Sequence, residues 1–95
     1  MTGIHSDSTD KLFQAILSLR DEEECYKFFE DLCTIGEIQA ISQRFAVATM
    51  LNKGEKHSKI AKETGASSAT ISRVNRWLHY GSGGYQLVLE RERTK

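Results

Sequence analysis

The sequence predicts an all-α protein, and three observations support this. The 95 residues include no proline, and five of the seven glycines lie beyond residue 50, so long stretches contain no helix breaker. Apolar residues recur at every third or fourth position, which is the period of an amphipathic helix. A chain of this length suits one domain with a small core. We place that domain at residues 8–95, after a flexible tail at residues 1–7.

Two amphipathic helices are expected in the N-terminal third. Ser8 or Asp7 is a suitable cap for the first, whose apolar face comprises Leu12, Phe13, Ile16 and Leu17. The second begins near Asp21, because the acids at residues 21–24 favour the positive end of a helix dipole. Its apolar face comprises Cys25, Phe28, Phe29, Leu32 and Cys33. The two cysteines would lie about 12 Å apart along one helix, too far for a disulfide, so we expect free thiols in the core.

A third helix is predicted to start at the string TIGE, residues 34–37. Thr34 and Glu37 have the spacing of a capping box, in which each side chain accepts from the backbone N–H of the other residue. The helix would run on to Asn52, with Gly54 as its stop signal. Its apolar residues cover more than one narrow stripe, namely Ile38, Ile41, Phe45, Val47, Ala48 and Leu51. We therefore expect a central helix that neighbours cover on several sides.

The stretch KIAKETGASSATISRVNRW, residues 59–77, is typical of a helix-turn-helix. A short helix from His57 or Ser58 to Thr64 would end at Gly65, which supplies a positive φ. Ser67 is a suitable N-cap for the next helix. The inward positions are Ile60, Ala61, Thr64, Ala66, Ile71, Val74 and Leu78. This spacing predicts a DNA-binding helix-turn-helix over residues 57–80.

The outward face of the second of these helices carries small hydroxyls and arginines. Serine and threonine are poor helix formers, and a merely solvated face would favour Glu, Lys and Gln. Small polar side chains can instead contact base edges, while arginines reach guanine or phosphates and the neighbouring lysines suit phosphates. The candidate DNA-binding residues are Lys56, Lys59, Ser67, Ser68, Ala69, Thr70, Ser72, Arg73 and Arg76. A structural hairpin with a solvated polar face is the alternative.

The formal net charge is zero, but the charges are unevenly distributed. Residues 1–37 carry nine acids and three bases, whereas residues 53–76 carry six bases and two acids, which gives −6 and +4. A basic segment in a neutral chain is typical of a nucleic-acid-binding face. A solvated helix surface would also be basic, so charge alone does not decide between the two.

Other functional classes find little support in the sequence. No apolar run approaches the roughly 20 residues that span a bilayer, and the N-terminus lacks the basic and apolar regions of a signal peptide, so we expect a cytoplasmic protein with no membrane partner. The cysteines and histidines lack the CxxC or HxxxH spacing of a zinc site. Without a nucleophile–base pair or a phosphate-cradling loop, we expect no enzyme.

The C-terminal stretch YGSGGYQLVLERERTK predicts a turn followed by a short helix. Gly81, Gly83 and Gly84 would separate two helices rather than bind phosphate. The apolar residues expected to pack back on the core are Tyr85, Leu87, Val88 and Leu89.

The chain resembles the tryptophan repressor family and, within it, the YerC/YecD branch of Trp-repressor-like proteins. The resemblance extends over residues 8–92 and is carried by the strings YKFFEDLCTIGEIQAISQRFAVATML, KIAKETGASSATISRVNRWLHYG and YQLVLERE. It implies six helices and an intertwined homodimer. The first three helices and the last would interlock between subunits, while the fourth and fifth would form the reading heads.

The resemblance also implies a ligand pocket between the central helix and the recognition helix. Repressors of this family bind L-tryptophan there through two arginines, a threonine and a serine, and Trp77 occupies the serine position in this chain. The candidate pocket residues are Thr34, Arg44, Arg73 and Trp77. Arg44 has a second interpretation, in which it pairs with an acid such as Glu37 or Asp31 and lies along the helix surface.

Two departures from the family pattern argue against L-tryptophan as the corepressor. An indole at Trp77 is large enough to fill the cavity, and it replaces a serine hydroxyl that would hydrogen-bond the ligand. The segment between Gly54 and Gly65 is also one residue shorter than in the tryptophan-binding members. We therefore expect no cofactor.

We predict a sequence-specific transcriptional regulator, a repressor, that binds double-stranded DNA as a homodimer. The limited core of so short a chain independently favours a dimer over a monomer. Two recognition helices would then enter successive major grooves about 34 Å apart. One alternative is a switch that senses a small metabolite other than tryptophan. Another is a protein-interaction module that keeps the helix-turn-helix as a scaffold.

Overall fold

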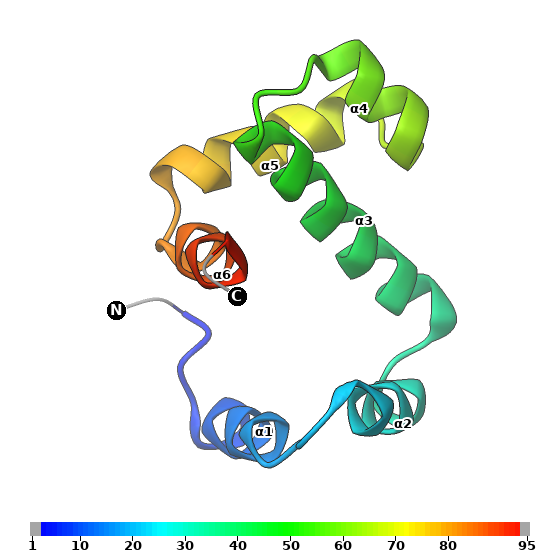
Figure 1. The fold of residues 1–95 in the computed structure, drawn as a ribbon. Coiled ribbons are helices and arrows are strands. Elements are labelled where there is room, and N and C mark those ends of the chain that lie inside the picture. Colours follow the sequence, from blue (N-terminus) through cyan, green and yellow to red (C-terminus); the bar gives the residue numbers. More distant parts are fainter. Residues whose placement is uncertain (1–2, 94–95) are drawn as a thin grey trace. The chain divides into compact units, whose positions relative to one another are not determined.

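The computed structural model describes residues 3–93, which form six α-helices and no strand (Figure 1). The helices are α1 (Asp7–Leu17), α2 (Glu22–Leu32), α3 (Ile35–Asn52), α4 (His57–Thr64), α5 (Ser68–Tyr80) and α6 (Gly84–Arg93). The all-α prediction is confirmed. Residues 1 and 2 of the expected tail and residues 94 and 95 of the expected domain lie outside the described residues. Among the helices described, none is long and apolar enough to cross a membrane.

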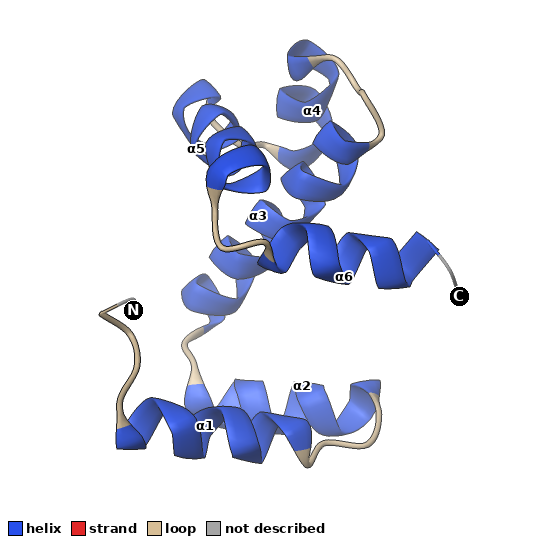
Figure 2. Cartoon of the chain, turned by 90° about the vertical axis from the view of Figure 1, so that its left-hand side faces the viewer, coloured by secondary structure: helices blue, strands red, loops and turns tan. Residues whose placement is uncertain are grey.

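The contacts gather in two compact units, residues 3–38 and 39–93. In the first unit, α1 and α2 run in opposite directions as a helical hairpin (Figure 2). Ser6, not Asp7 or Ser8, caps α1, because its extended backbone lets its hydroxyl accept from the N–H of Thr9 at 3.1 Å. Asp7 is consequently the first residue of the helix rather than its cap.

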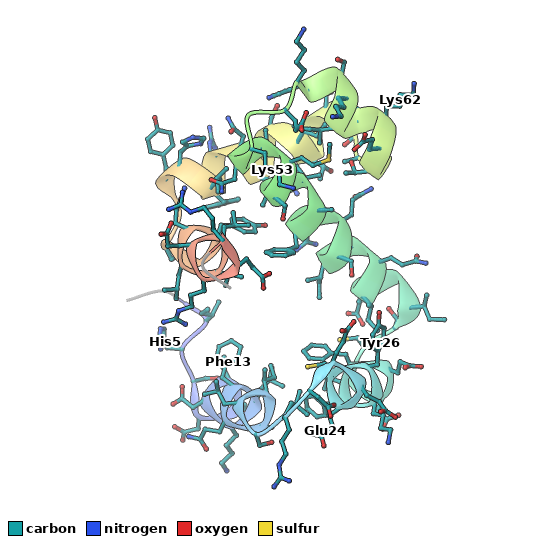
Figure 3. The ribbon with its side chains drawn as sticks, in the orientation of Figure 1. His5, Phe13, Glu24, Tyr26, Lys53 and Lys62 are labelled. Atoms are coloured by element: carbon teal, nitrogen blue, oxygen red, sulfur yellow. The ribbon has the colours of Figure 1, made fainter. Side chains whose placement is uncertain are left out.

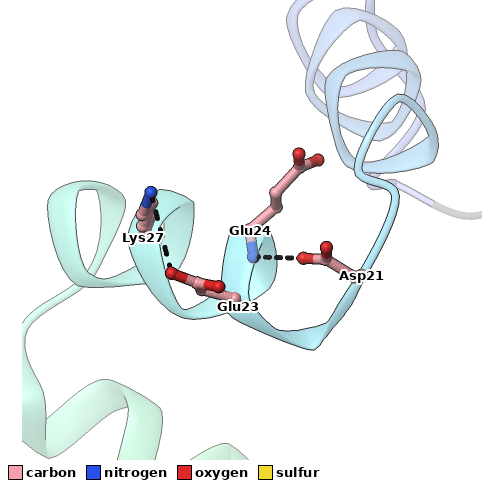
Figure 4. A network of polar contacts seen from close by, with 4 residues as sticks. All are labelled: Asp21, Glu23, Glu24 and Lys27. Carbon is pink, nitrogen blue, oxygen red and sulfur yellow. Dashed lines mark hydrogen bonds and ion pairs between the residues drawn. The ribbon is translucent and has the colours of Figure 1, made fainter.

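The start of α2 follows the prediction. Asp21 is the N-cap, and its carboxylate accepts from the N–H of Glu24 at 2.9 Å (Figure 4). One turn further on, Lys27 lies 3.9 Å from Glu23, an exposed pair at i, i+4 spacing (Figure 4). Such pairs add little stability in water, so the cap and the acidic first turn are the main local determinants of this helix.

Neither α1 nor α2 contains a buried residue. The prediction that both cysteines belong to the core is therefore wrong: Cys25 is exposed and Cys33 is half-buried. The apolar faces are at most half-buried, with Leu17 at 83% and Phe13 at 48% of their full accessibility, and Phe13 projects from α1 (Figure 3). The two helices have the apolar spacing of core helices but no core of their own.

The central helix α3 ends at Asn52, and Gly54 follows with a φ of 80°, as the stop signal predicted. Its buried residues are Val47 and Ala48 alone. The expectation that neighbours cover this helix on several sides is wrong for a single chain, because Ile41 and Phe45 are exposed at 51% and 39%.

The core of residues 39–93 is formed by α3, α4, α5 and α6. It consists of Val47, Ala48, Ile60, Ala66, Ile71, Val74, Leu78 and Leu89. Every position on α4, α5 and the turn that the sequence placed inside is buried or half-buried, so the helix-turn-helix pattern is confirmed. The prediction for α6 holds only in part: Leu89 is buried and Tyr85 packs on the core, but Leu87 and Val88 are exposed.

A left-handed residue makes the sharp turn between α4 and α5. Gly65 is the C-cap of α4 with a φ of 73° and a ψ of 6°, and its N–H donates to the carbonyl of Ala61 at 2.9 Å. Ala66 then enters the core, and Ser67 caps α5. A residue with a Cβ would have to adopt the same conformation, which disfavours any residue but glycine here.

We expect Gly65→Ala to lower the free energy of unfolding by about 1–2 kcal/mol, the cost of left-handed backbone for an L-residue. Denaturant titration followed by circular dichroism would measure it. Gly84→Ala is the matched control, since Gly84 begins α6 without a positive φ and a Cβ there meets nothing within 4 Å. Equal stabilities for the two variants would contradict the assignment of Gly65.

Candidate nucleic-acid interface

The N-terminus of α5 is fixed by its own side chains. Ser67 has extended backbone, and its hydroxyl accepts from the N–H of Thr70 at 3.1 Å. The hydroxyls of Ser67 and Thr70 are also bonded to each other at 3.1 Å. Thr70 is half-buried. Of the predicted DNA-binding residues, these two therefore shape the start of the helix, and their hydroxyls are already engaged.

The rest of α5 has one buried and one exposed face. Ile71, Val74 and Leu78 are at most 4% exposed and turn one face into the core. The exposed residues opposite include the predicted reading residues Ser68, Ala69, Ser72, Arg73 and Arg76. Ser68, Ser72 and Arg73 lie in the first two turns of α5 and can hydrogen-bond to a base edge or a phosphate. A recognition helix inserts these N-terminal turns into the groove.

Four lysines lie on α4 and on the segment before it. Lys53, Lys56, Lys59 and Lys62 are all exposed, and Lys62 extends away from α4 (Figure 3). Lys59 differs from the others, because its ammonium lies 3.1 Å from the carboxylate of Glu55. That hydrogen bond raises the pKa of Lys59, and the charges of Glu55 and Glu63 add to the shift. The predicted phosphate contact of Lys59 would therefore compete with an internal ion pair.

Glu55 lies two residues before α4 begins, so helical spacing by itself does not indicate its pairing with Lys59. Nothing in the pattern pointed to Gln43 or Gln86, whose side chains reach α4 and α5 from other helices. The one feature that could have identified Gln43 is its position as a polar residue among the apolar residues of α3.

A hollow of about 370 Å³ opens beside the exposed face of α5. It is lined by Ser72, Arg73, Arg76 and Trp77. Trp77 lies outside the core and is 54% exposed. Two of the four predicted pocket residues, Arg73 and Trp77, thus line one cavity, together with a hydroxyl and a second guanidinium.

The other two predicted pocket residues are not in that lining. Arg44 is exposed on α3, in the same unit as the hollow. Thr34 belongs to residues 3–38, where its hydroxyl accepts from the N–H of Glu37 at 3.1 Å and its own N–H donates to the Glu37 carboxylate at 2.8 Å. The capping box is therefore confirmed, and Thr34 and Glu37 are both committed to the start of α3. Within residues 3–93, no three His, Cys, Asp or Glu side chains are grouped as a metal site would need.

The fold and the exposed recognition helix define a helix-turn-helix protein, and comparisons with known proteins agree. The family model described as Trp repressor protein matches residues 7–93. The uncharacterized protein YerC of Bacillus subtilis is 60% identical over 82 residues, which are 86% of this chain and 79% of that protein.

Two solved structures resemble the chain closely. One is a candidate Trp repressor from Staphylococcus aureus, with a TM-score of 0.91 and 48% identity over 97% of this chain and 92% of that one. The other is a TrpR-like protein from Eubacterium eligens, with a TM-score of 0.90 and 57% identity over 93% and 91%. The chain belongs to the Trp repressor family, whose members are DNA-binding regulators and not enzymes.

The capping box makes part of the stability depend on pH. Hydrogen bonds from the Thr34 backbone N–H and hydroxyl lower the pKa of Glu37 below its ordinary value of 4.5. A lowered folded-state pKa means that the contribution is fully present above pH 4.5 and is lost as the pH falls through the folded value. We expect wild type to be more stable than Glu37→Gln at pH 7, with the difference shrinking below pH 4.5.

Urea titrations of both proteins between pH 3 and pH 7 would measure this difference. Glu30→Gln serves as the control, because Glu30 lies on the exposed face of α2 and takes no part in a cap. A gap between wild type and Glu37→Gln that stays constant with pH would contradict the role of the carboxylate.

Proposed function

We propose that this protein is a sequence-specific repressor of transcription that binds double-stranded DNA as a homodimer. Residues 57–80, which comprise α4, the turn and α5, form what we call the reading head. In this proposal Ser68, Ala69 and Ser72 contact base edges, and Arg73 and Arg76 contact guanine or phosphates. Lys53, Lys56 and Lys62 contact phosphates.

The observation that carries the proposal is the asymmetry of α5. One face is buried against the core, while the other combines short polar side chains with two guanidinium groups, all exposed. Such a face is poor in helix formers and makes few contacts within the chain, so stability does not explain it. Insertion into a major groove does, because short side chains allow the helix backbone to approach the bases.

Exposed apolar surface supports the homodimer. Large apolar side chains on α1, α2 and α3 remain open in the single chain, among them Leu17 and Ile35 at 83% and 76% exposure. Apolar residues at helical spacing that find no core within one chain are typical of helices buried between subunits. Sedimentation equilibrium should give twice the chain mass of 10.7 kDa, and a mass of one chain would refute the dimer.

L-tryptophan has no part in this proposal, because an indole side chain already occupies the matching position in α5. A second candidate function, a switch for another small metabolite, is favoured by the hollow beside Trp77. Two guanidinium groups, a hydroxyl and an aromatic ring would suit a small anion with a flat apolar part. Calorimetry with amino acids and nucleotides tests it, and the absence of any heat of binding across the set would count against a ligand.

We expect the double variant Arg73→Ala/Arg76→Ala to bind its operator at least about 30-fold more weakly than wild type. Each bidentate contact to a guanine contributes about 1–3 kcal/mol of discrimination, and two contacts are removed. The operator would first be selected from genomic fragments with the wild-type protein. Fluorescence anisotropy with the selected fragment would then measure the dissociation constants.

Arg20→Ala/Lys27→Ala is the matched control, because it removes the same positive charge from exposed residues outside the reading head. It should bind nearly as tightly as wild type. A folded double-arginine variant with undiminished affinity would show that α5 does not read DNA. Affinity that hardly depends on salt would favour a protein-interaction module instead.

We expect Glu55→Gln to strengthen DNA binding, because it frees Lys59 from its internal ion pair. The slope of log binding constant against log salt should become steeper by about 0.9 for each chain, the contribution of one further phosphate contact. Anisotropy titrations at several salt concentrations would give the slope. Glu30→Gln removes the same charge from α2 and should leave the slope unchanged, and an unchanged slope in Glu55→Gln would exclude Lys59 from the interface.

A further inference from the structure

Two glutamine side chains join the reading head to helices outside it. Gln43 on α3 donates its amide N–H to the carbonyl of Thr64 at 3.1 Å. Gln86 on α6 donates its amide N–H to the carbonyl of Leu78 at 3.0 Å. The first bond spans 21 residues of sequence and the second spans eight, so each connects one helix with another.

Both acceptors are carbonyls at the C-terminal end of a helix. Thr64 is the last residue of α4, and Leu78 lies in the last turn of α5, which ends at Tyr80. The last four carbonyls of an α-helix accept no hydrogen bond from the helix itself, so their donors must come from elsewhere. Each glutamine supplies such a partner from a helix outside the reading head.

One bond is made just before α5, at the last residue of α4, and the other is made near the C-terminal end of α5. Thr64 stands three residues before the N-cap Ser67, in a turn that is further tightened by a 3.1 Å bond from the N–H of Ala66 to the Thr64 hydroxyl. Leu78 stands two residues before the end of the same helix. The proposed reading residues of α5, from Ser68 to Arg76, therefore lie between the two attachments.

Burial of one face of α5 decides which side chains face outward, but it does not by itself fix the angle at which the helix lies against its neighbours. Apolar contacts through Ile71, Val74 and Leu78 favour burial but have no directional preference. Hydrogen bonds are directional and weaken steeply when misaligned. A binding site needs its residues held within about 0.5 Å and 10–20° of the productive arrangement. Bonds just before the helix and near its C-terminal end supply that restraint.

We infer that Gln43 and Gln86 are positioning residues, which set the angle at which α5 presents its reading residues. This inference rests on the proposed DNA-binding function. In a dimer, two recognition helices must match half-sites whose separation is fixed by the pitch of DNA. A head that is free to rotate would still attract phosphates but would match this separation poorly. Loss of either bond therefore lowers discrimination between operator and random DNA, while binding to random DNA is retained.

The test compares Gln43→Leu, Gln86→Leu and the double variant with wild type in the full chain. Three quantities are measured: the operator affinity, the affinity for random duplex DNA, and the preference among operators whose half-sites are one base pair closer together or further apart. Each single variant should lose about tenfold in the ratio of operator to random-DNA affinity, the equivalent of one hydrogen bond. The preference for one half-site separation should broaden, most strongly in the double variant.

Gln39→Leu is the matched control, since Gln39 is exposed on the same helix as Gln43. It should keep the wild-type ratio and separation preference. Gln43→Asn and Gln86→Asn keep the amide but shorten the side chain by one methylene, so they should behave like the leucine variants and serve if those fail to fold. Circular dichroism confirms that each variant is helical.

The outcomes separate this inference from the proposed function. If wild type prefers an operator and the glutamine variants keep its ratio and separation preference, the positioning role is overturned and DNA reading stands. If wild type prefers no sequence over random DNA, the proposed function fails and the positioning role fails with it. A variant that loses operator and random-DNA affinity equally would also overturn the inference, because that pattern indicates lost binding surface rather than lost orientation.

Discussion

Burial of one face of α5 is the constraint on which the rest of the reading head depends. Ile71, Val74 and Leu78 join the core formed with α3, α4 and α6. Because a helix turns once in about 3.6 residues, fixing three positions inward also fixes which positions face outward. Ser72 and Arg73 are exposed for this reason, and the left-handed turn at Gly65 makes the close crossing of α4 and α5 sterically accessible.

The two units of the chain have complementary physical characters. Residues 39–93 contain the core, nine lysines and arginines and four acids, whereas residues 3–38 contain nine acids, three bases and a large share of the exposed apolar surface. The excess positive charge of residues 39–93 would attract anionic DNA, and the excess negative charge of residues 3–38 would repel it. The electrostatic field therefore favours contact through the reading head. In the proposed homodimer, burial against another subunit would remove this apolar surface from water.

Much of the fold and part of the candidate site could be predicted from the sequence, because the relevant signals are local. Asp21, the Thr34–Glu37 capping box, Gly65 and Ser67 act within one helical turn, and the structure has each in its predicted role. The cap of α1 was misplaced because three adjacent polar residues can all serve as caps, and backbone conformation selects Ser6. Periodicity located the helix-turn-helix because its apolar positions are buried within one chain.

Sequence alone thus determined the helices, the turn and the identity of the outward residues on α5, all of which depend on neighbours within a few positions. Only the tertiary structure decided which apolar residues are covered: Leu17, Cys25 and Phe45 have the spacing of core residues, yet no neighbouring helix of the same chain covers them fully. It also decided that Gln43 and Gln86 bond to the ends of α4 and α5. Helical periodicity predicts which face of a helix is apolar. It does not predict which other helix covers that face, because contacts between residues distant in sequence depend on tertiary packing.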